Sequence, residues 1–475
     1  MKTIRRAAKT DATRKRIMEA ARRVFTRYPY DAAGLRIMGR EGGFNHSFIR
    51  YHFRSKENLF EAVSKDLIAQ YASAADGLLQ GLDGPLFRNT EILVDRFVEF
   101  AFDHPDAFYV MMLNLGAVDH VSGAFPGMRF LRTFHEDTLA LFSASDFFTA
   151  PQEDVNRVFF CSSVMLANCV GAARFFGKIL DMDPRGTAYR RWVKDLFVFL
   201  LYPVIKKLVF AENVPGPTGK RTPAAGNGGL CPVTGASTDV ARLPAQSQPS
   251  QGDDQPEPGG GTRGEISRRR IIAVARRIFS RYPYNATSIR MIGAEGGFDF
   301  TLIYHYFPTK AELFEAVVSQ LLDEHMATVR SIMTEPGRGR LRDNTRNIIT
   351  RLMDYCFSHP DVMKGAMQNI AQVDRFEDLP GFDILTRFLV DSLALFREFM
   401  PLSEEDEQTR MWLYGFGIVI FNCVGAASYH ARVMGMTAGS RDYRRWVKDT
   451  LRYMFYPSLK ALLFSGGPTV EKTEK

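Results

Sequence analysis

Two stretches of this sequence are close copies of each other: TRKRIMEAARRVFTRYPYDAAGLRIMGREGGF at residues 13–44 and SRRRIIAVARRIFSRYPYNATSIRMIGAEGGF at residues 267–298. Their offset is 267 − 13 = 254, and the same offset relates the segments NCVGAA and YRRWVKD near residues 168 and 189 to their second occurrences. The triplet HPD at 104–106 returns one position out of step at 359–361, so one residue is inserted between the copies there. A unit of about 200 residues is therefore duplicated as a whole.

Apolar residues in both copies follow the spacing of an amphipathic helix. Ile17, Ala21, Val24 and Phe25 are spaced i, i+4, i+7 and i+8, and the second copy repeats them one offset later. The segments 91–102, 155–180 and 192–210 are long, apolar and free of turn signals, and no strand-like alternation lies between them. We predict an all-α protein.

A helix-turn-helix follows the first helix in each copy. In the first copy, a short helix at 35–41 leads to the turn Gly42-Gly43 and to a third helix opening at Asn45, a favourable N-cap. In the second copy, Asp299 caps the corresponding helix, which ends near Phe307. Two short helices around a glycine turn suit DNA, because the second helix fits the major groove while the first crosses the backbone.

At these motifs the sequence resembles the TetR family of bacterial repressors. The resemblance is carried by RIFxxYPYNATSIRxIG at residues 277–293, by the Gly-Gly turn, and by IYHYFPTKxxLFxAV at residues 303–317. It implies a three-helix DNA-binding domain, a larger helical domain that holds an effector pocket, and dimerisation through the last two helices of that domain. It also implies that Lys56 and Lys310 grip phosphate and that Tyr304 contacts the DNA backbone.

We therefore predict two tandem units, each a three-helix helix-turn-helix domain followed by a helical regulatory and dimerisation domain. Between them lies a stretch rich in Pro, Gly, Ala, Ser and Gln, which predicts a flexible linker with a typical span of roughly 40 Å. The predicted ranges are a basic arm at 1–12, helix-turn-helix domains at 13–64 and 265–318, regulatory domains at 65–210 and 319–465, the linker at 211–264 and a tail at 466–475.

The recognition helices differ between the copies, although the rest of the helix-turn-helix domain is similar. Over 13–63 and 267–317, 26 of 51 positions are identical, but between 45–52 and 299–306 only Ile49 and Ile303 agree. We expect that Ile to pack inward, so that a shared scaffold presents two different outward faces. An ordinary homodimer reads a palindrome because its two-fold symmetry is copied onto the DNA. This chain is therefore predicted to read a non-palindromic operator.

Particular contacts can be proposed for the two faces. Arg50 suits a phosphate or a guanine edge, and Phe300 and Leu302 suit thymine methyl groups. The residues predicted to contact DNA are Asn45, His46, Ser47, Phe48, Arg50, Tyr51, His52 and Lys56 in the first copy, and Asp299, Phe300, Thr301, Leu302, Tyr304, His305, Tyr306 and Lys310 in the second.

Helix caps distinguish the copies. Thr309 with Glu312 forms a capping box, and Ser55 caps the same helix in the first copy. The second helix of the second copy has Thr287-Ser288 before it, whereas the first copy has Ala33-Gly34, which lacks the hydroxyl at a cost of about 1 kcal/mol.

Basic residues precede each first helix. They are Lys2, Arg5, Arg6, Lys9, Arg14, Lys15 and Arg16 in the first copy, with a shorter equivalent at Arg268, Arg269 and Arg270. Next to a DNA-binding motif, such an arm is expected to follow phosphates or enter a minor groove, and the alternative is a solvated tail.

The repeated NCVGAA and YRRWVKD segments predict the interface between the units. Small residues let another helix approach closely, and the two pairs of helices would complete a four-helix interface. Burial inside one unit is the alternative. The predicted interface residues are Cys169, Gly171, Ala172, Trp192, Cys423, Gly425, Ala426 and Trp446.

An effector cavity is implied by the resemblance, and residues rich in Phe, Met and Leu at 108–115, 130–142 and 159–176 would line it, or would form an ordinary core. The HPD triplets invite a catalytic interpretation. Proline at a helix start, with a carboxylate in the first turn, explains them without catalysis. No nucleophile triad, phosphate-binding glycine loop or metal cluster is found in the sequence, so neither an enzyme, a cofactor nor a metal is predicted.

The charge balance agrees with this interpretation. Lys and Arg number 61 against 53 Asp and Glu, a net charge of +8 that favours anionic partners only where it is concentrated. The five cysteines form no CxxC pair, and no apolar run reaches about 18 residues, so we expect a bacterial cytoplasmic protein without a membrane partner, nucleoid-associated when bound to DNA.

The sequence thus predicts a DNA-binding transcriptional regulator, a ligand-responsive repressor that binds double-stranded DNA as a single-chain pseudo-dimer and responds to a small hydrophobic effector. Two alternatives stay open. Two chains pair into a four-headed assembly, or the protein is a ligand-binding or interaction protein whose helix-turn-helix units are degenerate.

Overall fold

The computed structural model describes residues 2–78, 80–115, 150–210, 262–334, 341–370, 379–399 and 407–464. Most of the predicted linker, the predicted tail and the predicted cavity-lining segment 130–142 lie outside these residues. Every regular element in the described ranges is a helix, which confirms the all-α prediction. The chain divides into a large unit, Met1–Ala211 with Arg270–Lys475, and a small one, Glu212–Arg269.

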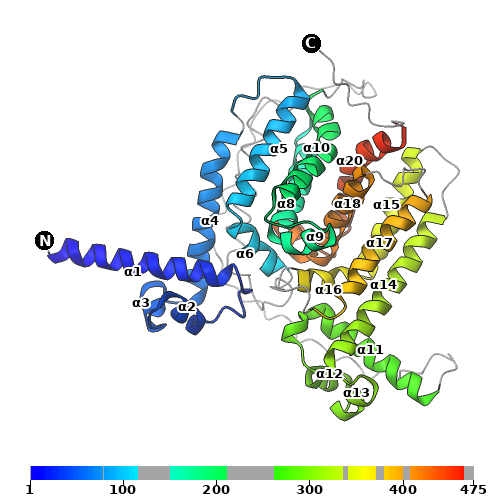
Figure 1. Ribbon diagram of the computed structural model, residues 1–475, viewed down its shortest axis with the longest axis horizontal. Helices are drawn as coiled ribbons and strands as arrows, with labels where there is room; N and C mark the ends of the chain where they lie inside the picture. Colours follow the sequence, from blue (N-terminus) through cyan, green and yellow to red (C-terminus); the bar gives the residue numbers. More distant parts are fainter. Residues whose placement is uncertain are drawn as a thin grey trace, which may run out of the picture. The chain divides into compact units, whose positions relative to one another are not determined.

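The two halves contain matching series of helices (Figure 1). The first half contains α1 (Lys2–Phe25), α2 (Leu35–Gly42), α3 (Ser47–Phe53), α4 (Lys56–Leu78), α5 (Leu86–Asp103), α6 (Asp106–Leu115), α8 (Gln152–Gly171), α9 (Ala173–Ile179) and α10 (Thr187–Val209). The second contains α11 (Arg263–Arg281), the short 3-10 helix η2 (Tyr284–Ala286), α12 (Ile289–Gly296), α13 (Phe300–Tyr306), α14 (Lys310–Thr334), α15 (Leu341–Ser358), α16 (Asp361–Ile370), α17 (Phe382–Phe399), α18 (Glu407–Gly425), α19 (Ala427–Val433) and α20 (Arg441–Phe464).

The predicted apolar stripe of the first helix forms the core of each three-helix domain. Ile17, Ala21, Val24 and Phe25 are all at most 1% exposed. The Phe25 ring meets Phe60 of α4 edge-on at 4.8 Å, and Phe279 meets Phe314 at the same distance in the second half. Because α4 and α14 run unbroken past residues 64 and 318, each three-helix domain shares a helix with the domain that follows it.

Two sequence expectations about helix limits differ from the structure. The predicted basic arm at 1–12 is not separate from the first helix, because α1 begins at Lys2. The segment 155–180 is not one helix, because α8 ends at Gly171 and α9 leaves it at an angle of 80°. The apolar pattern continues through this bend, since residues on both sides of it are buried, so hydrophobicity alone did not mark it.

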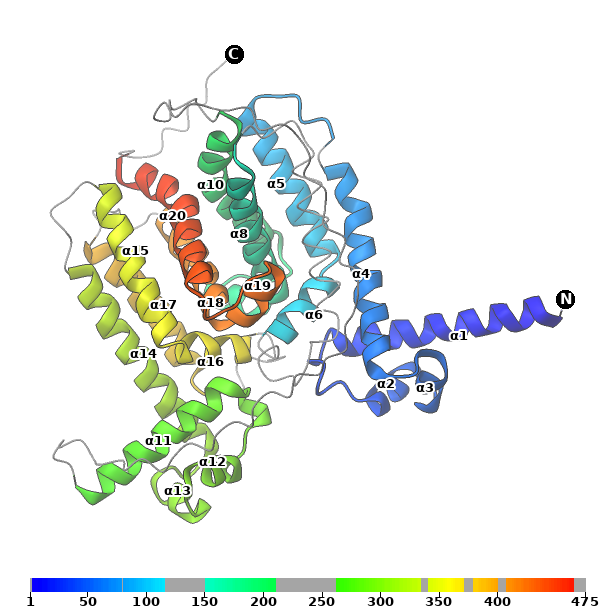
Figure 2. The same cartoon turned by 180° about the vertical axis from the view of Figure 1, so that it is seen from behind.

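The long helices of the two halves pack against each other. Helices α8 and α10 contact both α18 and α20, and Figures 1 and 2 show the four lying side by side from opposite directions. Trp192 of α10 meets Tyr414 of α18 edge-on at 5.8 Å, and Trp446 of α20 meets Phe160 of α8 at 4.9 Å. The second pair repeats the first at an offset of 254 residues, so the contact is pseudo-symmetric.

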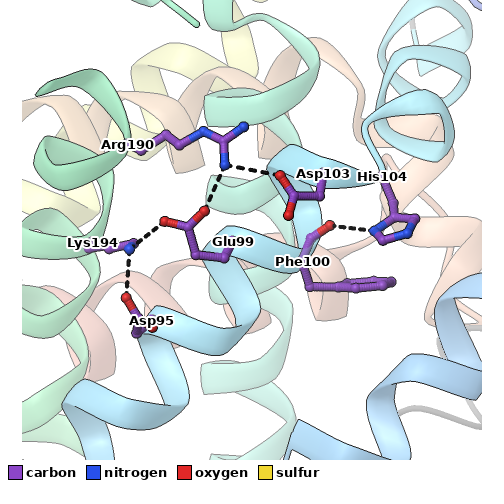
Figure 3. A network of polar contacts seen from close by, with 7 residues as sticks. All are labelled: Asp95, Glu99, Phe100, Asp103, His104, Arg190 and Lys194. Atoms are coloured by element: carbon purple, nitrogen blue, oxygen red, sulfur yellow. Dashed lines mark hydrogen bonds and ion pairs between the residues drawn. The ribbon is translucent and has the colours of Figure 1, made fainter. Parts of the chain in front are cut away.

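Ion pairs fasten α5 to α10 within the first half (Figure 3). Arg190 donates to Glu99 at 2.6 Å and to Asp103 at 3.0 Å, and Lys194 donates to Glu99 and Asp95, both at 2.5 Å. The hydrogen bond from Lys194 is the largest cause of the lowered pKa of Glu99. In the second half, Thr350 and Ser358 replace Asp95 and Asp103. Lys448, the counterpart of Lys194, therefore pairs at these positions only with Asp354, the counterpart of Glu99.

No single helix in the described part of the chain is long and apolar enough to cross a membrane. Two pairs of helices, α8 with α9 and α18 with α19, have the length and composition of a membrane span only when taken together, and each pair is sharply bent.

Candidate nucleic-acid interface

The turn between the second and third helices of each domain depends on a glycine. Gly43 and Gly297 each have φ of +64°, the left-handed region in which a side chain is strained. Each glycine ends the helix before it and redirects the chain into the recognition helix, α3 or α13. The predicted helix-turn-helix geometry is thus present in both halves.

Ile49 and Ile303 are both 0% exposed, which confirms that the identical residue packs inward. Asp299 caps α13 as predicted, since its carboxylate accepts the Thr301 N–H at 2.8 Å. In the first half, α3 begins at Ser47, so Asn45 lies two residues before the helix. Its Oδ1 still accepts the Ser47 N–H at 2.9 Å. The inward anchor and the caps fix which side chains point away from the domain.

The outward faces differ between the halves. On α3, Tyr51 is the most exposed aromatic residue at 78%, beside Phe48 at 47%. On α13, Phe300, Leu302 and Tyr304 are 46%, 37% and 47% exposed. Of the other predicted contact residues, Asn45, His46, Ser47, Arg50, Asp299, Thr301 and His305 are exposed, and His52 and Tyr306 are half-buried.

The two lysines at the next helix start are engaged inside their own domains. Lys56 Nζ donates to the Tyr30 carbonyl at 2.8 Å and lies 4.1 Å from the centre of that ring. Lys310 does the same with Tyr284 at 2.9 Å and 4.0 Å, and it also donates to the Thr287 carbonyl. Burial lowers the pKa of both lysines. The structure gives them a bracing role, and their contact with phosphate stays a prediction.

Two arginines of the predicted basic arm also contact their own domain. Arg14 donates to the His52 carbonyl at 3.3 Å and lies over the Phe53 ring, and Arg16 donates to the Gly42 carbonyl at 3.0 Å. They therefore brace the turn and the end of the recognition helix.

The caps of the neighbouring helices agree with the sequence. Ser288 accepts the Met291 N–H at 3.2 Å, whereas Gly34 provides no side-chain cap for α2. Ser55 accepts the Asn58 N–H at 3.0 Å, and Thr309 accepts the Glu312 N–H at 3.1 Å. The difference predicted between the second helices of the two halves is confirmed.

Each helix-turn-helix domain is joined to α6 or α16 by contacts that the sequence did not predict. Arg22 pairs with Asp106 at 2.5 Å, and the Tyr30 N–H donates to Asn114 Oδ1 at 2.8 Å. Arg276 with Asp361 at 2.9 Å, and Tyr284 with Asn369 at 2.9 Å, repeat the arrangement. The HPD carboxylate does begin a helix, as predicted, but it also holds the DNA-binding domain. The HPD triplet occurs in both copies despite the one-residue insertion, and this was the sequence feature that could have indicated the contact.

The predicted interface residues separate into two groups. Trp192 and Trp446 lie between the halves, as described above. Gly171 and Gly425 do not face the other half, because a Cβ there would lie 2.8 Å from the Phe108 carbonyl oxygen and 2.6 Å from that of Met363, each in the same half. The alternative, burial inside one unit, therefore holds for these two glycines. Cys169 and Cys423 are buried and accept the hydroxyl of Tyr189 and of Tyr443 at their carbonyls, and Ala172 and Ala426 lie buried at the bends.

A glycine that the sequence analysis did not single out makes the close approach between the halves. A Cβ on Gly415 of α18 would lie 2.5 Å from Leu200 Cδ1 of α10. Its counterpart one offset earlier is Cys161, another small residue, which is 0% exposed. Comparing small residues between the two copies would have found this position.

A cavity of about 200 Å³ lies in the first half. Part of its wall is Phe108, Met111, Phe159 and Phe160, from two of the three segments that the sequence analysis named. Met111 and Phe108 belong to α6, the helix that Asp106 ties to α1. No group of three His, Cys, Asp or Glu side chains able to hold a metal occurs among the described residues.

Comparison with known proteins places both helix-turn-helix domains in one family. Residues 17–63 and 271–317 each match the family described as bacterial regulatory proteins, tetR family. A segment of 70 residues is 36% identical to the HTH-type transcriptional repressor Rv1474c of Mycobacterium tuberculosis, covering 14% of this chain and 37% of that protein. The chain thus spans little more than a third of this relative's length.

Two solved structures are similar to part of the chain. A tetR-family transcriptional regulator from Streptomyces coelicolor aligns with a TM-score of 0.31 and 18% identity over 41% of this chain and 83% of its own. A second, from Mesorhizobium loti, aligns with a TM-score of 0.32 and 17% identity over 41% of this chain and 98% of its own.

Proposed function

Since this chain belongs to the TetR family of transcriptional regulators and carries the family's DNA-binding domain twice, we propose that it is a ligand-responsive repressor that reads a non-palindromic operator as a single-chain pseudo-dimer. Its partner is double-stranded DNA, and its place of action is the nucleoid of the bacterial cytoplasm. It acts by binding rather than by catalysis.

The observation that carries this proposal is the contrast between scaffold and surface. Ile49 and Ile303 are buried alike, and both turns use a glycine at the same φ. No exposed position of the two recognition helices holds the same residue in both halves. For example, Arg50 of α3 corresponds to Tyr304 of α13. Major-groove recognition depends on the side chains that reach base edges. Two such faces on one chain select two different half-sites.

Packing between the halves supports the pseudo-dimer. The aromatic pairs Trp192 with Tyr414 and Trp446 with Phe160 join helices of one chain, and Gly415 permits the close approach of α18 to α10. A tether of the predicted linker's length keeps the halves at an effective concentration in the millimolar range. A second chain is then not needed to bring two recognition helices to one operator.

Ligand response is supported by the position of α6. This helix contributes Phe108 and Met111 to the cavity wall, and through Asp106 and Asn114 it holds the DNA-binding domain. If a ligand binds one position of α6 more tightly than another, it shifts the population toward that position and with it the spacing of the recognition helices. This part of the proposal fails if no small molecule changes the affinity for DNA.

The decisive experiment is selection of binding sites from random duplex DNA with the whole chain, repeated with Arg50→Ala and with Tyr304→Ala. We expect a bipartite, asymmetric site in which each substitution blurs a different half. Enrichment of a palindromic site would contradict the proposal that the chain reads a non-palindromic operator. If no sequence is enriched at physiological salt, and affinity simply falls as salt rises, the units are degenerate and the protein binds DNA only through its charge.

Mass in solution separates the single-chain proposal from its rival. A particle of 53.7 kDa in the absence of DNA supports the pseudo-dimer. A doubled mass supports a four-headed assembly of two chains.

A further inference from the structure

The interface between the halves contains two equivalent helix crossings that are filled by different residues. At one of them, Gly415 of α18 lies against Leu200 of α10. The equivalent crossing joins α8 to α20, and one offset away its two positions hold Cys161 and Met454. Cys161, Leu200 and Met454 are at most 1% exposed, and Gly415 is buried. Both crossings therefore lie inside packed core.

The crossing at Gly415 has no room for a side chain. A Cβ there would lie 2.5 Å from Leu200 Cδ1, whereas nonbonded carbon atoms prefer a separation of about 3.5–4.0 Å. It would also lie 3.5 Å from Met165 Sδ and from Phe455 Cε1, so it would enter a position that is already surrounded. Leu200 and Met165 are both 0% exposed and have no solvent to move into. A cysteine at this position would therefore force the crossing apart.

A pair of two first halves would place Cys161 at this position. Such a pair has a true two-fold axis, so each of its contacts occurs twice. Each Cys161 would meet Leu200 of the other copy, and neither crossing would have the glycine that this contact requires. A pair of two second halves would not meet this collision, because both of its crossings would hold Gly415.

A polar contact favours the same choice of partner. Trp192 of the first half donates its indole N–H to Glu407 of the second half. A first half offers Glu153 at that position, and its carboxylate forms an ion pair with Arg157 of its own helix. In the second half, Glu407 has only a longer contact of this kind, with Arg410 at 3.5 Å. A pair of first halves would have to give up an ion pair to make the hydrogen bond.

We propose that the face of the first half formed by α8 and α10 binds a second half and rejects another first half, and that Cys161 is the residue that excludes the like pair. One chain contains one half of each kind, so a pair of second halves would leave two first halves without a partner. Rejection of the first-half pair is therefore enough to favour mixed pairing.

This inference rests on the pseudo-dimer of the proposed function and specifies the partner that its interface accepts. Two chains can then associate through this interface only by exchanging halves, with the first half of one chain on the second half of the other.

The first test measures the collision in the uncut chain. Gly415→Cys places the residue of the first half at the crossing of the second, and should lower the folding equilibrium constant about tenfold or more in urea denaturation. Gly417→Cys is the matched control on the same helix, because a Cβ there would meet no described neighbouring segment within 4 Å. Leu200→Ala should be costly alone, but its cost and that of Gly415→Cys should not add in the double variant. Equal stability of Gly415→Cys and Gly417→Cys would overturn the proposal.

The second test lets the halves choose their partners. A site for a sequence-specific protease is placed in the predicted linker, and the folded chain is cut. Cut protein is mixed with an equal amount labelled with heavy nitrogen, unfolded in urea, refolded, and examined by native mass spectrometry without DNA. We expect pairs of one first and one second half, with the labels mixed, and no pairs of two first halves. Cys161→Gly removes the excluding side chain and should make first-half pairs appear.

First-half pairs in the cut parent protein, at the share expected from random pairing, would overturn the proposal. So would a Cys161→Gly variant that forms no more of them than the parent. These outcomes do not depend on an operator or a ligand. A doubled mass of the uncut chain would instead reject the single-chain pseudo-dimer, and mixed pairs in the cut protein would still support the exclusion of like pairs, so the two proposals can fail separately.

Discussion

The indole N–H of Trp192 donates to Glu407 Oε1 at 2.5 Å across 215 residues of sequence, and so joins α10 of the first half to the start of α18 in the second. The aromatic contacts around this hydrogen bond are pseudo-symmetric. The glutamate at the corresponding position of the first half has a different partner. Glu153, the counterpart of Glu407, forms an ion pair with Arg157 of its own helix. The two halves therefore share apolar packing at their interface and differ in its polar contacts.

Trp192→Phe should lower the free energy of unfolding of the whole chain by about 1–2 kcal/mol, because it removes a hydrogen bond to a charged group and keeps a ring against Tyr414. Urea denaturation followed by circular dichroism measures this. Combining the change with Glu407→Gln completes a double-mutant cycle. A coupling energy near zero would show that the contact contributes nothing.

The contacts between Arg22 and Asp106 and between Arg276 and Asp361 allow a matched comparison. Asp106→Asn should speed amide hydrogen exchange in residues 13–64 by about three- to fivefold, since a partly exposed ion pair contributes up to roughly 1 kcal/mol. Asp361→Asn should do the same for residues 265–318, and each variant is the other's control. Equal effects on both domains would show that the pairs do not act locally.

Gly34→Ser should stabilise the first helix-turn-helix domain by about 0.5–1 kcal/mol, through a cap on α2 and a smaller entropy of the unfolded chain. Gly34 has φ of −75° and ψ of 145°, which serine adopts easily, and a Cβ there would lie at an ordinary 3.9 Å from Ile37. Thermal unfolding measures the gain. Ser288→Ala is the reverse experiment in the second domain and should cost about 1 kcal/mol; a loss of stability in Gly34→Ser would contradict the prediction.

His325 makes stability depend on pH. It is buried on α14 between the Tyr355 and Phe388 rings, and burial lowers its pKa from 6.5 to about 4. The unfolded chain takes up a proton near pH 6.5 while the folded chain stays neutral, so this contribution is present above pH 6.5 and is lost as pH falls toward 4.

Between pH 7 and pH 5 the loss should be about 2 kcal/mol. Denaturant unfolding at a series of pH values should therefore show a shallower pH dependence for His325→Phe than for the unchanged chain. An identical slope in both proteins would place the pH dependence elsewhere.

The amino-acid sequence was sufficient to predict the duplication, the helical class, the inward place of Ile49 and Ile303, and the caps at Ser55 and Asp299. These properties depend on identity between copies or on interactions within about four residues, which can be read along the chain.

The tertiary structure was needed to show which distant residues meet. It placed Gly171 against α6 of its own half and gave the close approach between halves to Gly415. Arg22 and Asp106 are 84 positions apart, and both are residue types that a helix surface carries for many reasons. Such contacts follow from how whole helices pack, and periodicity within one helix does not specify the neighbour that its buried face will meet.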